Sequence, residues 1–163
     1  MARSLQEQRH MADHFSEQQT EPAGHPDPSA SLVFTFPRGL PGFDQERRFR
    51  LDADPQLDPL VRLESLKTNG LSFLAAPVEL LDPDYELQLS REDQEALGVP
   101  GGEPDPVDFL CLALLAEAGE GQWTANLLAP VVTYLPRGRS VQAVRHDDRY
   151  SHCHPLPGQE AAC

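Results

Sequence analysis

The sequence predicts a mainly β protein, an antiparallel sandwich or barrel of about eight short strands with one short helix. Short runs rich in β-branched, aromatic and other apolar residues recur along the chain, and turn-forming residues separate them. The 163 residues include 16 prolines and 11 glycines, which favours short elements joined by many turns. This length favours one domain, and the 39% of apolar residues is sufficient for its core.

Ordered structure is expected to begin at Ser31, where a polar stretch gives way to strand-forming residues. Residues 1–30 contain few large apolar side chains, so they are predicted to be a disordered N-terminal extension. Leu32–Phe36 is rich in β-forming residues and ends before Pro37, which predicts the first strand. The domain is expected to span residues 31–157, followed by a flexible tail at residues 158–163.

The next strands are predicted from alternating polar and apolar residues and from the turns between them. They cover residues 46–51, 60–66, 71–76 and 85–89. Thr68-Asn69-Gly70 carries the Asn-Gly pair that is typical of a two-residue hairpin turn. The alternation over Tyr85–Leu89 is the clearest of the set, which indicates a half-buried strand.

The single predicted helix begins after Ser90, which is placed to cap its first turn. Asp93 stands at the capping-box position, and the helix is expected to end at Gly98. Val107–Leu115 is the most apolar run; its strand-like neighbours favour a buried strand, although its Ala and Leu content is compatible with a helix. Residues 131–135 and 140–145 predict a final hairpin.

Negative charge is concentrated in one part of the chain. The net charge is −13, and residues 79–120 hold twelve acidic residues against the single basic residue Arg91. Such a field repels nucleic acid and attracts basic partners, although a solvated acidic surface that only aids solubility is the alternative. No apolar run reaches the ~20 residues of a membrane helix, and the N-terminus lacks a signal-peptide core. We therefore expect a soluble cytoplasmic protein that binds neither membrane nor nucleic acid directly.

The sequence contains no phosphate-binding or dinucleotide-binding motif, and no spacing that singles out an acid–base pair. The tail His152-Cys153-His154 is the one candidate for a metal site or a thiol nucleophile. Adjacent residues of an extended segment point to opposite faces, and a zinc site needs three or four protein ligands. The odd number of three cysteines gives no disulfide framework. We therefore predict no catalytic residue, no cofactor and no metal, with an enzyme or metal protein using this tail as the alternative.

The segment Thr124–Val132 contains no group that can do acid–base or nucleophilic work. Asn126 stands among apolar neighbours, so its amide is expected to be partly buried and hydrogen-bonded as an internal pin. Pro130 lacks a backbone donor and therefore suits the first residue of a strand or an edge.

Three segments carry a recognisable set of motifs: FTFPRGLPGF at Phe34–Phe43, TANLLAPVV at Thr124–Val132, and Tyr-Ser-His-Cys-His-Pro-Leu at Tyr150–Leu156. Together and in this order they resemble the bacterial flagellar assembly factor family FliW. The first resembles the opening motif of the family, the second its TANLxAPV signature, and the third its closing Tyr-Ser-x-x-His-Pro-Leu motif, with His152 and Cys153 at the variable positions. The resemblance covers about residues 31–156, and it implies a small antiparallel β-barrel-like domain.

The resemblance implies a binding protein. Members of the family bind flagellin in the cytoplasm, and they bind the translational regulator CsrA and relieve its repression of flagellin mRNA. The two partners compete, so that secretion of flagellin frees the factor to act on CsrA. We expect this chain to do the same and to be a monomer when unbound.

The residues expected to contact partners come from the family motifs and from the acidic stretch. They are Phe36, Leu40, Phe43, Glu79, Asp82, Asp84, Glu86, Asn126, Tyr150 and His154. Burial in the core is the alternative for the aromatic members, and an internal pin is the alternative for Asn126.

Overall fold

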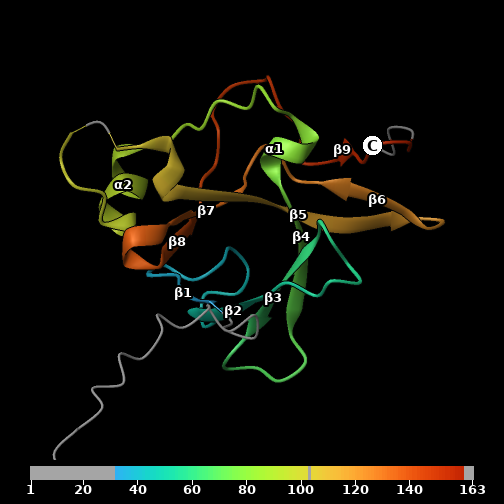
Figure 1. Ribbon diagram of the computed structural model, residues 1–163, viewed down its shortest axis with the longest axis horizontal. Helices are drawn as coiled ribbons and strands as arrows, with labels where there is room; N and C mark the ends of the chain where they lie inside the picture. Colours follow the sequence, from blue (N-terminus) through green and yellow to red (C-terminus); the bar gives the residue numbers. More distant parts are fainter. Residues whose placement is uncertain (1–31, 103, 160–163) are drawn as a thin grey trace, which may run out of the picture. The chain divides into compact units, whose positions relative to one another are not determined.

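The computed structural model describes residues 32–102 and 104–159. The predicted N-terminal extension, residues 1–30, and the last four residues of the predicted tail lie outside the described residues. The regular secondary structure of the described part is mostly strand, as the sequence predicts, and α2 with seven residues is its longest helix. Figure 1 gives the order of its elements.

Seven strands form a closed barrel, and the sequence-based prediction of a small antiparallel β-barrel is confirmed. The barrel strands are β1 (Leu32–Thr35), β2 (Arg48–Asp52), β3 (Val61–Ser65), β4 (Ser72–Pro77), β5 (Phe109–Gly119), β7 (Val131–Tyr134) and β8 (Arg139–Gln142). Neighbours are antiparallel except at the closure, where β1 meets β8 in parallel through Thr35 and Arg139. Closure removes the free sheet edges that a flat sheet would expose.

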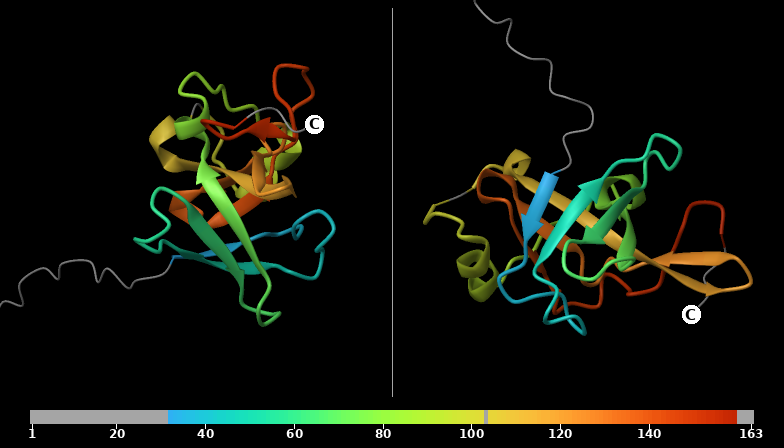
Figure 2. Two further views of the ribbon diagram at one scale, coloured as in Figure 1. Left: turned by 90° about the vertical axis from the view of Figure 1, so that its right-hand side faces the viewer. Right: turned by 90° about the horizontal axis from the view of Figure 1, so that it is seen from below.

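Strand β5 belongs to two structures at once. Its first part pairs with β7, from Phe109 opposite Tyr134 to Leu112 opposite Val131, while β4 pairs with its other edge. Its second part leaves the barrel and pairs with β6 (Gln122–Ala125), which in turn pairs with β9 (His154–Pro155). Figure 2 shows β5 running past the barrel into this hairpin.

Apolar residues cover both faces of β5, which explains its continuous apolar sequence. Leu110, Leu112 and Leu114 point into the barrel, where they pack in the cluster that contains Phe36 and Phe49. The alternate residues lie on the outer face in two further clusters: Phe109, Cys111, Ala113 and Leu115. The outer face is covered by α1 (Val78–Leu81), by α2 (Arg91–Leu97) and by the connection between them.

Helix α2 is confirmed with both of its predicted ends. The Ser90 hydroxyl accepts a hydrogen bond from the Asp93 backbone N–H at 3.0 Å, and the Asp93 carboxylate accepts from the Ser90 N–H at 3.3 Å. Gly98 ends the helix with φ 72°, a left-handed conformation that costs little only for glycine. Leu97 is fully buried and packs with Val132 of β7 and Val141 of β8, so the cap orients the helix on the barrel.

One local prediction is wrong, and one short strand was missed. Tyr85–Leu89 is extended, but it is not a strand, because it crosses the outer face of the barrel and no strand among the described residues pairs with it. Its alternation is real, since Leu87 and Leu89 pack on the outer apolar cluster while Glu86 and Gln88 are exposed. Strand β6 was not predicted, because its four residues carry too short a pattern to detect.

Gly39 and Gly42 provide a matched test of the loop that follows β1. Both have positive φ, 75° and 82°. A Cβ at Gly39 would lie 2.7 Å from the Asp44 carbonyl oxygen, whereas a Cβ at Gly42 would meet nothing within 4 Å. We expect Gly42→Ala to lower the free energy of unfolding by about 1–2 kcal/mol and Gly39→Ala by roughly 1–3 kcal/mol more. Urea unfolding of both variants measures the difference, and equal losses would contradict the close approach of the Asp44 backbone to Gly39.

Candidate partner-binding site

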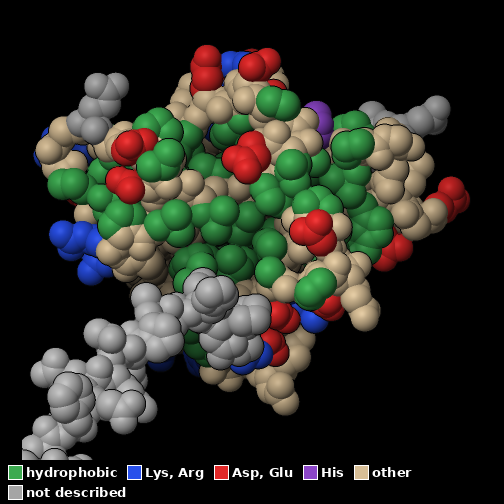
Figure 3. Space-filling view, viewed as in Figure 1, with side chains coloured by type: hydrophobic (Ala, Val, Ile, Leu, Met, Phe, Trp, Pro, Cys, Tyr) green, Lys and Arg blue, Asp and Glu red, His purple; other side chains and the backbone are tan. Residues whose placement is uncertain are grey.

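An open groove of about 1140 Å³ lies between the connection that follows α1 and the start of β5. Its apolar lining comes from several segments and includes Val78, Leu87, Leu89, Phe109 and Cys111. Figure 3 shows hydrophobic side chains gathered across the face that carries α1, α2 and β5, with separate acidic groups among them. A concave apolar surface with a few polar groups is the usual form of a binding site.

The charge in this groove has one sign. Of the described residues that line it, Glu79, Asp82 and Glu86 are acidic and none is basic. Glu79 and Glu86 are exposed. Two large apolar side chains that follow lining residues in the sequence are also exposed: Leu80, after Glu79, by 50% and Val107, after Pro106, by 77%. The groove therefore combines apolar contact area with negative charge, which suits a partner that carries both apolar and basic side chains.

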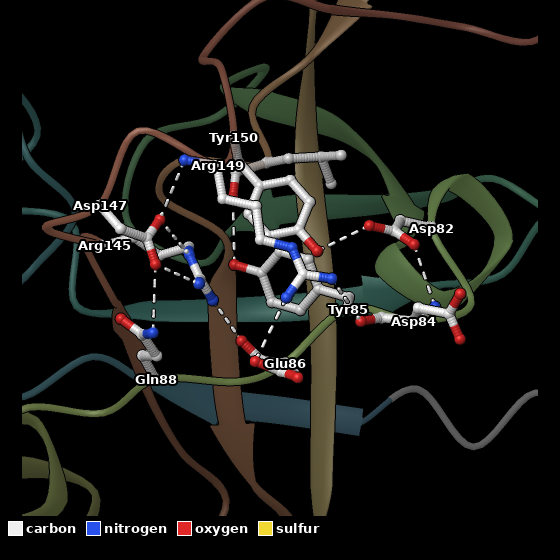
Figure 4. A network of polar contacts seen from close by, with 10 residues as sticks. Asp82, Asp84, Tyr85, Glu86, Gln88, Arg145, Asp147, Arg149 and Tyr150 are labelled. Carbon is white, nitrogen blue, oxygen red and sulfur yellow. Dashed lines mark hydrogen bonds and ion pairs between the residues drawn. The ribbon is translucent and has the colours of Figure 1, made fainter.

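Arg145 holds the segment that forms one wall of this groove. Its side chain is only 1% exposed, and its Nε donates to Asp147 Oδ1 at 3.1 Å. Its Nη1 donates to the carbonyl oxygen of Glu86, 59 residues away in the sequence. The guanidinium also lies over the rings of Tyr150 and Tyr85, 4.8 and 5.2 Å from their centroids. Figure 4 shows these contacts, which join the extended segment to the loop that follows β8.

Two tyrosines complete the network. The rings of Tyr85 and Tyr150 pack with centroids 4.6 Å apart. The Tyr150 hydroxyl donates to Asp82 Oδ2 at 2.6 Å, and the Tyr85 hydroxyl donates to the Leu127 carbonyl oxygen at 3.0 Å. The bond from Tyr150 is the main reason that the pKa of Asp82 lies below its usual value. Burial, together with the Asp82 carboxylate, raises the pKa of Tyr150 to about 12.

Arg149 is a second, more exposed link between the same segments. Its guanidinium forms an ion pair with Glu86 at 3.2 Å and donates to the Asp84 carbonyl oxygen at 3.3 Å. It lies 5.3 Å from the centroid of the Tyr150 ring. Arg145 and Arg149 thus hold Asp84 and Glu86 in place while leaving the exposed acidic side chains facing solvent.

The bond between Tyr150 and Asp82 should make stability depend on acid pH. Because the folded pKa of Asp82 is lowered, its contribution is present above the unfolded pKa of about 3.9 and is lost as pH falls through the folded pKa. We therefore expect Tyr150→Phe to destabilise the fold at neutral pH and to lose that effect as the pH falls through the lowered folded pKa of Asp82. Tyr85→Phe is the control, since its hydroxyl bonds to a carbonyl that does not titrate. Urea unfolding across pH measures both, and parallel pH profiles for the two variants would contradict the assignment.

The structure brings together four residues that the sequence singled out: Asp82, Asp84, Glu86 and Tyr150. His154 in β9 lies near them, since its charge contributes to the lowered pKa of Asp82. The sequence analysis missed Arg145, Asp147 and Arg149. The signal that could have found them is the excess of arginine over acidic residues beyond residue 121, opposite the acidic stretch.

Two residues expected to contact partners are core residues instead. Phe36 and Leu40 are 0% and 2% exposed and pack inside the barrel, so they offer no surface to a partner. Phe43 is 40% exposed and packs edge-on against Phe73 at 5.1 Å between ring centroids. The FPRGLPGF loop is tied to α2 instead, because Arg38 donates to Glu92 at 2.8 Å and also to Asp93.

Asn126 holds its loop in place through hydrogen bonds, which is the structural alternative given for it above. It is half-buried, its Oδ1 accepts the Ala129 N–H at 2.9 Å, and its own N–H donates to the Leu114 carbonyl oxygen at 2.9 Å. The next residue, Leu127, is fully buried and bonds through its backbone to Tyr85 and Ser151. Asn126 thus shapes the turn that places the Leu127 carbonyl oxygen against the tyrosine network.

We expect Asn126→Ala to lower the free energy of unfolding by about 1–2 kcal/mol, because the buried Ala129 N–H loses its acceptor. Asn126→Asp keeps an acceptor at the same position and should lose less. Thermal unfolding of both variants tests the pin. A variant Asn126→Ala that melts like wild type yet no longer binds a protein partner that wild type binds would instead assign this residue to the partner surface.

The cysteine- and histidine-containing tail does not form a cluster. Within residues 32–102 and 104–159, no group of three or more His, Cys, Asp or Glu side chains is arranged to hold a metal ion. His152 is exposed. Cys153 is disulfide-bonded, a bond that the sequence analysis did not predict. Burial raises the pKa of the Cys111 thiol to about 11, which keeps it protonated at neutral pH.

The FliW protein family model matches residues 17–156 of this sequence. This chain belongs to the FliW family. The match begins inside the predicted N-terminal extension, at residues outside the described part. Flagellar assembly factor FliW of Treponema pallidum (strain Nichols) is 32% identical over 144 residues, which cover 88% of this chain and 93% of that protein.

Two further comparisons with FliW proteins also cover most of this chain. Flagellar assembly factor FliW of Bacillus subtilis (strain 168) is 29% identical over 127 residues, covering 78% of this chain and 87% of that protein. A crystal structure of the flagellar assembly factor FliW superposes with a TM-score of 0.65 at 27% identity. That superposition covers 76% of this chain and 84% of the solved chain, so the barrel is the family fold. No helix within the described residues is long and apolar enough to cross a membrane.

Proposed function

We propose that this chain is a non-enzymatic flagellar assembly factor that binds flagellin and the translational regulator CsrA in the cytoplasm. Membership of the FliW family carries the proposal, because its relatives from Treponema pallidum and Bacillus subtilis are named flagellar assembly factors. In this proposal the chain relieves CsrA repression of flagellin mRNA translation, and it is a monomer when neither partner is bound.

The acidic groove supports the part of the proposal that concerns CsrA. A regulator that binds RNA presents basic surface, and the groove offers Glu79, Asp82 and Glu86 without a basic lining residue among those described. Charge complementarity of this kind raises the association rate and excludes RNA as a direct ligand of the same surface.

A reconstitution with three purified components tests the proposal. CsrA is bound to a labelled flagellin mRNA leader, and this chain is then titrated in while RNA release is followed by fluorescence anisotropy. We expect release of the RNA as the chain is added, no binding of the chain to RNA alone, and recapture of the RNA after flagellin is added. Failure to bind either CsrA or flagellin in size-exclusion runs of the same proteins would overturn the proposal.

A further inference from the structure

The extended segment along the groove has backbone groups without partners. Within the described part of the chain, the N–H and C=O of both Leu87 and Gln88 and the N–H of Leu89 form no hydrogen bond. The segment contains no turn or bend, and its side chains alternate between half-buried and exposed from Tyr85 to Leu89. It therefore has the conformation of a strand and lacks only a neighbouring strand.

Two contacts show which backbone groups face the groove. The C=O of Glu86 accepts from Arg145, a residue that does not line the groove. The C=O of Leu89 accepts from Gln94 Nε2 at 3.3 Å, and Gln94 does line it. Since successive residues of an extended chain direct their backbone groups to opposite sides, the N–H and C=O of Leu87 and the N–H of Leu89 face the groove.

The lining of the groove defines the side chains that a ligand strand would carry. Its half-buried apolar residues Leu87, Leu89 and Phe109 offer contact area to one row of side chains. The acidic side chains offer charge partners to the other row, and the carboxylate of Glu79 forms no ion pair among the described residues. A strand that alternates apolar residues with Lys or Arg would place its apolar side chains on the apolar lining and its basic side chains at the carboxylates. Its backbone would pair with the unpaired N–H and C=O groups of the groove segment.

We propose that this groove binds an extended segment of a partner protein, with alternating apolar and basic residues, as an added β-strand along Tyr85–Leu89. The added strand exchanges backbone hydrogen bonds with Leu87 and accepts from the N–H of Leu89, while its basic residues meet Glu79 and Glu86. The inference rests on the proposed function in one respect: it assumes that the chain acts by binding other proteins.

A pair of variants at Leu87 separates backbone pairing from side-chain contact. Leu87→Pro removes the N–H that faces the groove, and Leu87→Val keeps it with a similar apolar volume. The proline removes no internal hydrogen bond, and the preceding residue is already extended, so the fold should tolerate it. Melting curves of both full-length variants check this.

The probe is a capped, fluorescently labelled eight-residue peptide that alternates valine and lysine. We expect it to bind wild type and Leu87→Val alike and Leu87→Pro about tenfold more weakly, the loss expected for roughly one backbone bond. A peptide with glutamate in place of lysine, and a lysine peptide N-methylated at alternate residues, should both bind at least about tenfold more weakly. Equal affinity for Leu87→Pro and Leu87→Val would overturn the proposal.

Amide hydrogen exchange measured by NMR on the wild-type chain is the second test, and it does not depend on any variant folding. The peptide should slow exchange at Leu87 and Leu89 and leave Glu86 and Gln88 unchanged, because only alternate donors pair with one neighbour. Protection elsewhere, or at none of these four amides, would overturn the added strand. If the peptide gives this pattern while CsrA and flagellin do not bind, the proposed partners are wrong and the groove assignment stands.

Discussion

Replacing Arg145 with methionine should lower the free energy of unfolding by about 3 kcal/mol. The guanidinium is buried, pairs with Asp147, bonds to the Glu86 carbonyl oxygen and lies over two tyrosine rings. Its loss leaves the part-buried carbonyl oxygen of Glu86 without a donor and the Asp147 carboxylate without its charge partner. The expected loss is at the low end of the range for broken buried pairs, because Asp147 is 37% exposed and can be hydrated.

Arg149→Met is the matched control for this prediction. It also removes one positive charge and one contact with the Tyr150 ring, but its side chain is 44% exposed and its partner Glu86 is 74% exposed. Exposed ion pairs contribute roughly 0.2–1 kcal/mol, so this variant should melt close to wild type. Urea unfolding of both variants measures the two losses of unfolding free energy. Equal losses would show that the contribution of Arg145 to stability does not come from its burial.

The barrel could be predicted from the sequence because its strands follow local rules. Runs such as Leu32–Phe36 combine strand-forming residues with a proline at the end, and β5 is apolar on both faces. Helix α2 was predictable to its ends because its caps are read from single residues, Ser90 and Gly98. The failure at Tyr85–Leu89 has a physical reason: alternation reports which side chains are buried, and says nothing of whether the backbone has a neighbour.

The acidic residues of the site could be predicted because they lie close together in the sequence. Its arginines could not, because they lie far from the acidic residues in the sequence. Asp82, Asp84 and Glu86 stand together in one acidic stretch. Arg145 and Arg149 reach the same segment from 59 and 65 residues away, through contacts that follow from the path of the chain around the barrel. The two aromatic residues of the FPRGLPGF segment show a different limit, because the sequence identifies them but does not say which one is buried. Phe36 is as apolar as Phe43, and only the direction of the loop decides that one is core and the other exposed.

Neutralising the exposed acidic residues of the site should slow association with CsrA by about tenfold at low salt. The variant combines Glu79→Gln, Asp84→Asn and Glu86→Gln, all at exposed positions. Asp82 is left intact because it accepts the bond from Tyr150, and its loss would mix stability with binding. Removing Glu86 also frees the charge of Arg149, which adds to the repulsion of a basic partner. Stopped-flow measurements should show a shallower salt dependence of the rate and little change in dissociation.

The control removes three charges of the same kinds from other surfaces, with Asp44→Asn, Glu117→Gln and Glu120→Gln. Both variants then have the same net charge, and both leave the acidic lining residue Asp82 in place, so a general effect of the protein's charge would slow them equally. A larger loss for the groove variant means that the position of the charge matters, as short-range steering into the groove requires. An association rate equal to that of wild type, or equal losses in the two variants, would mean that the acidic groove does not guide CsrA.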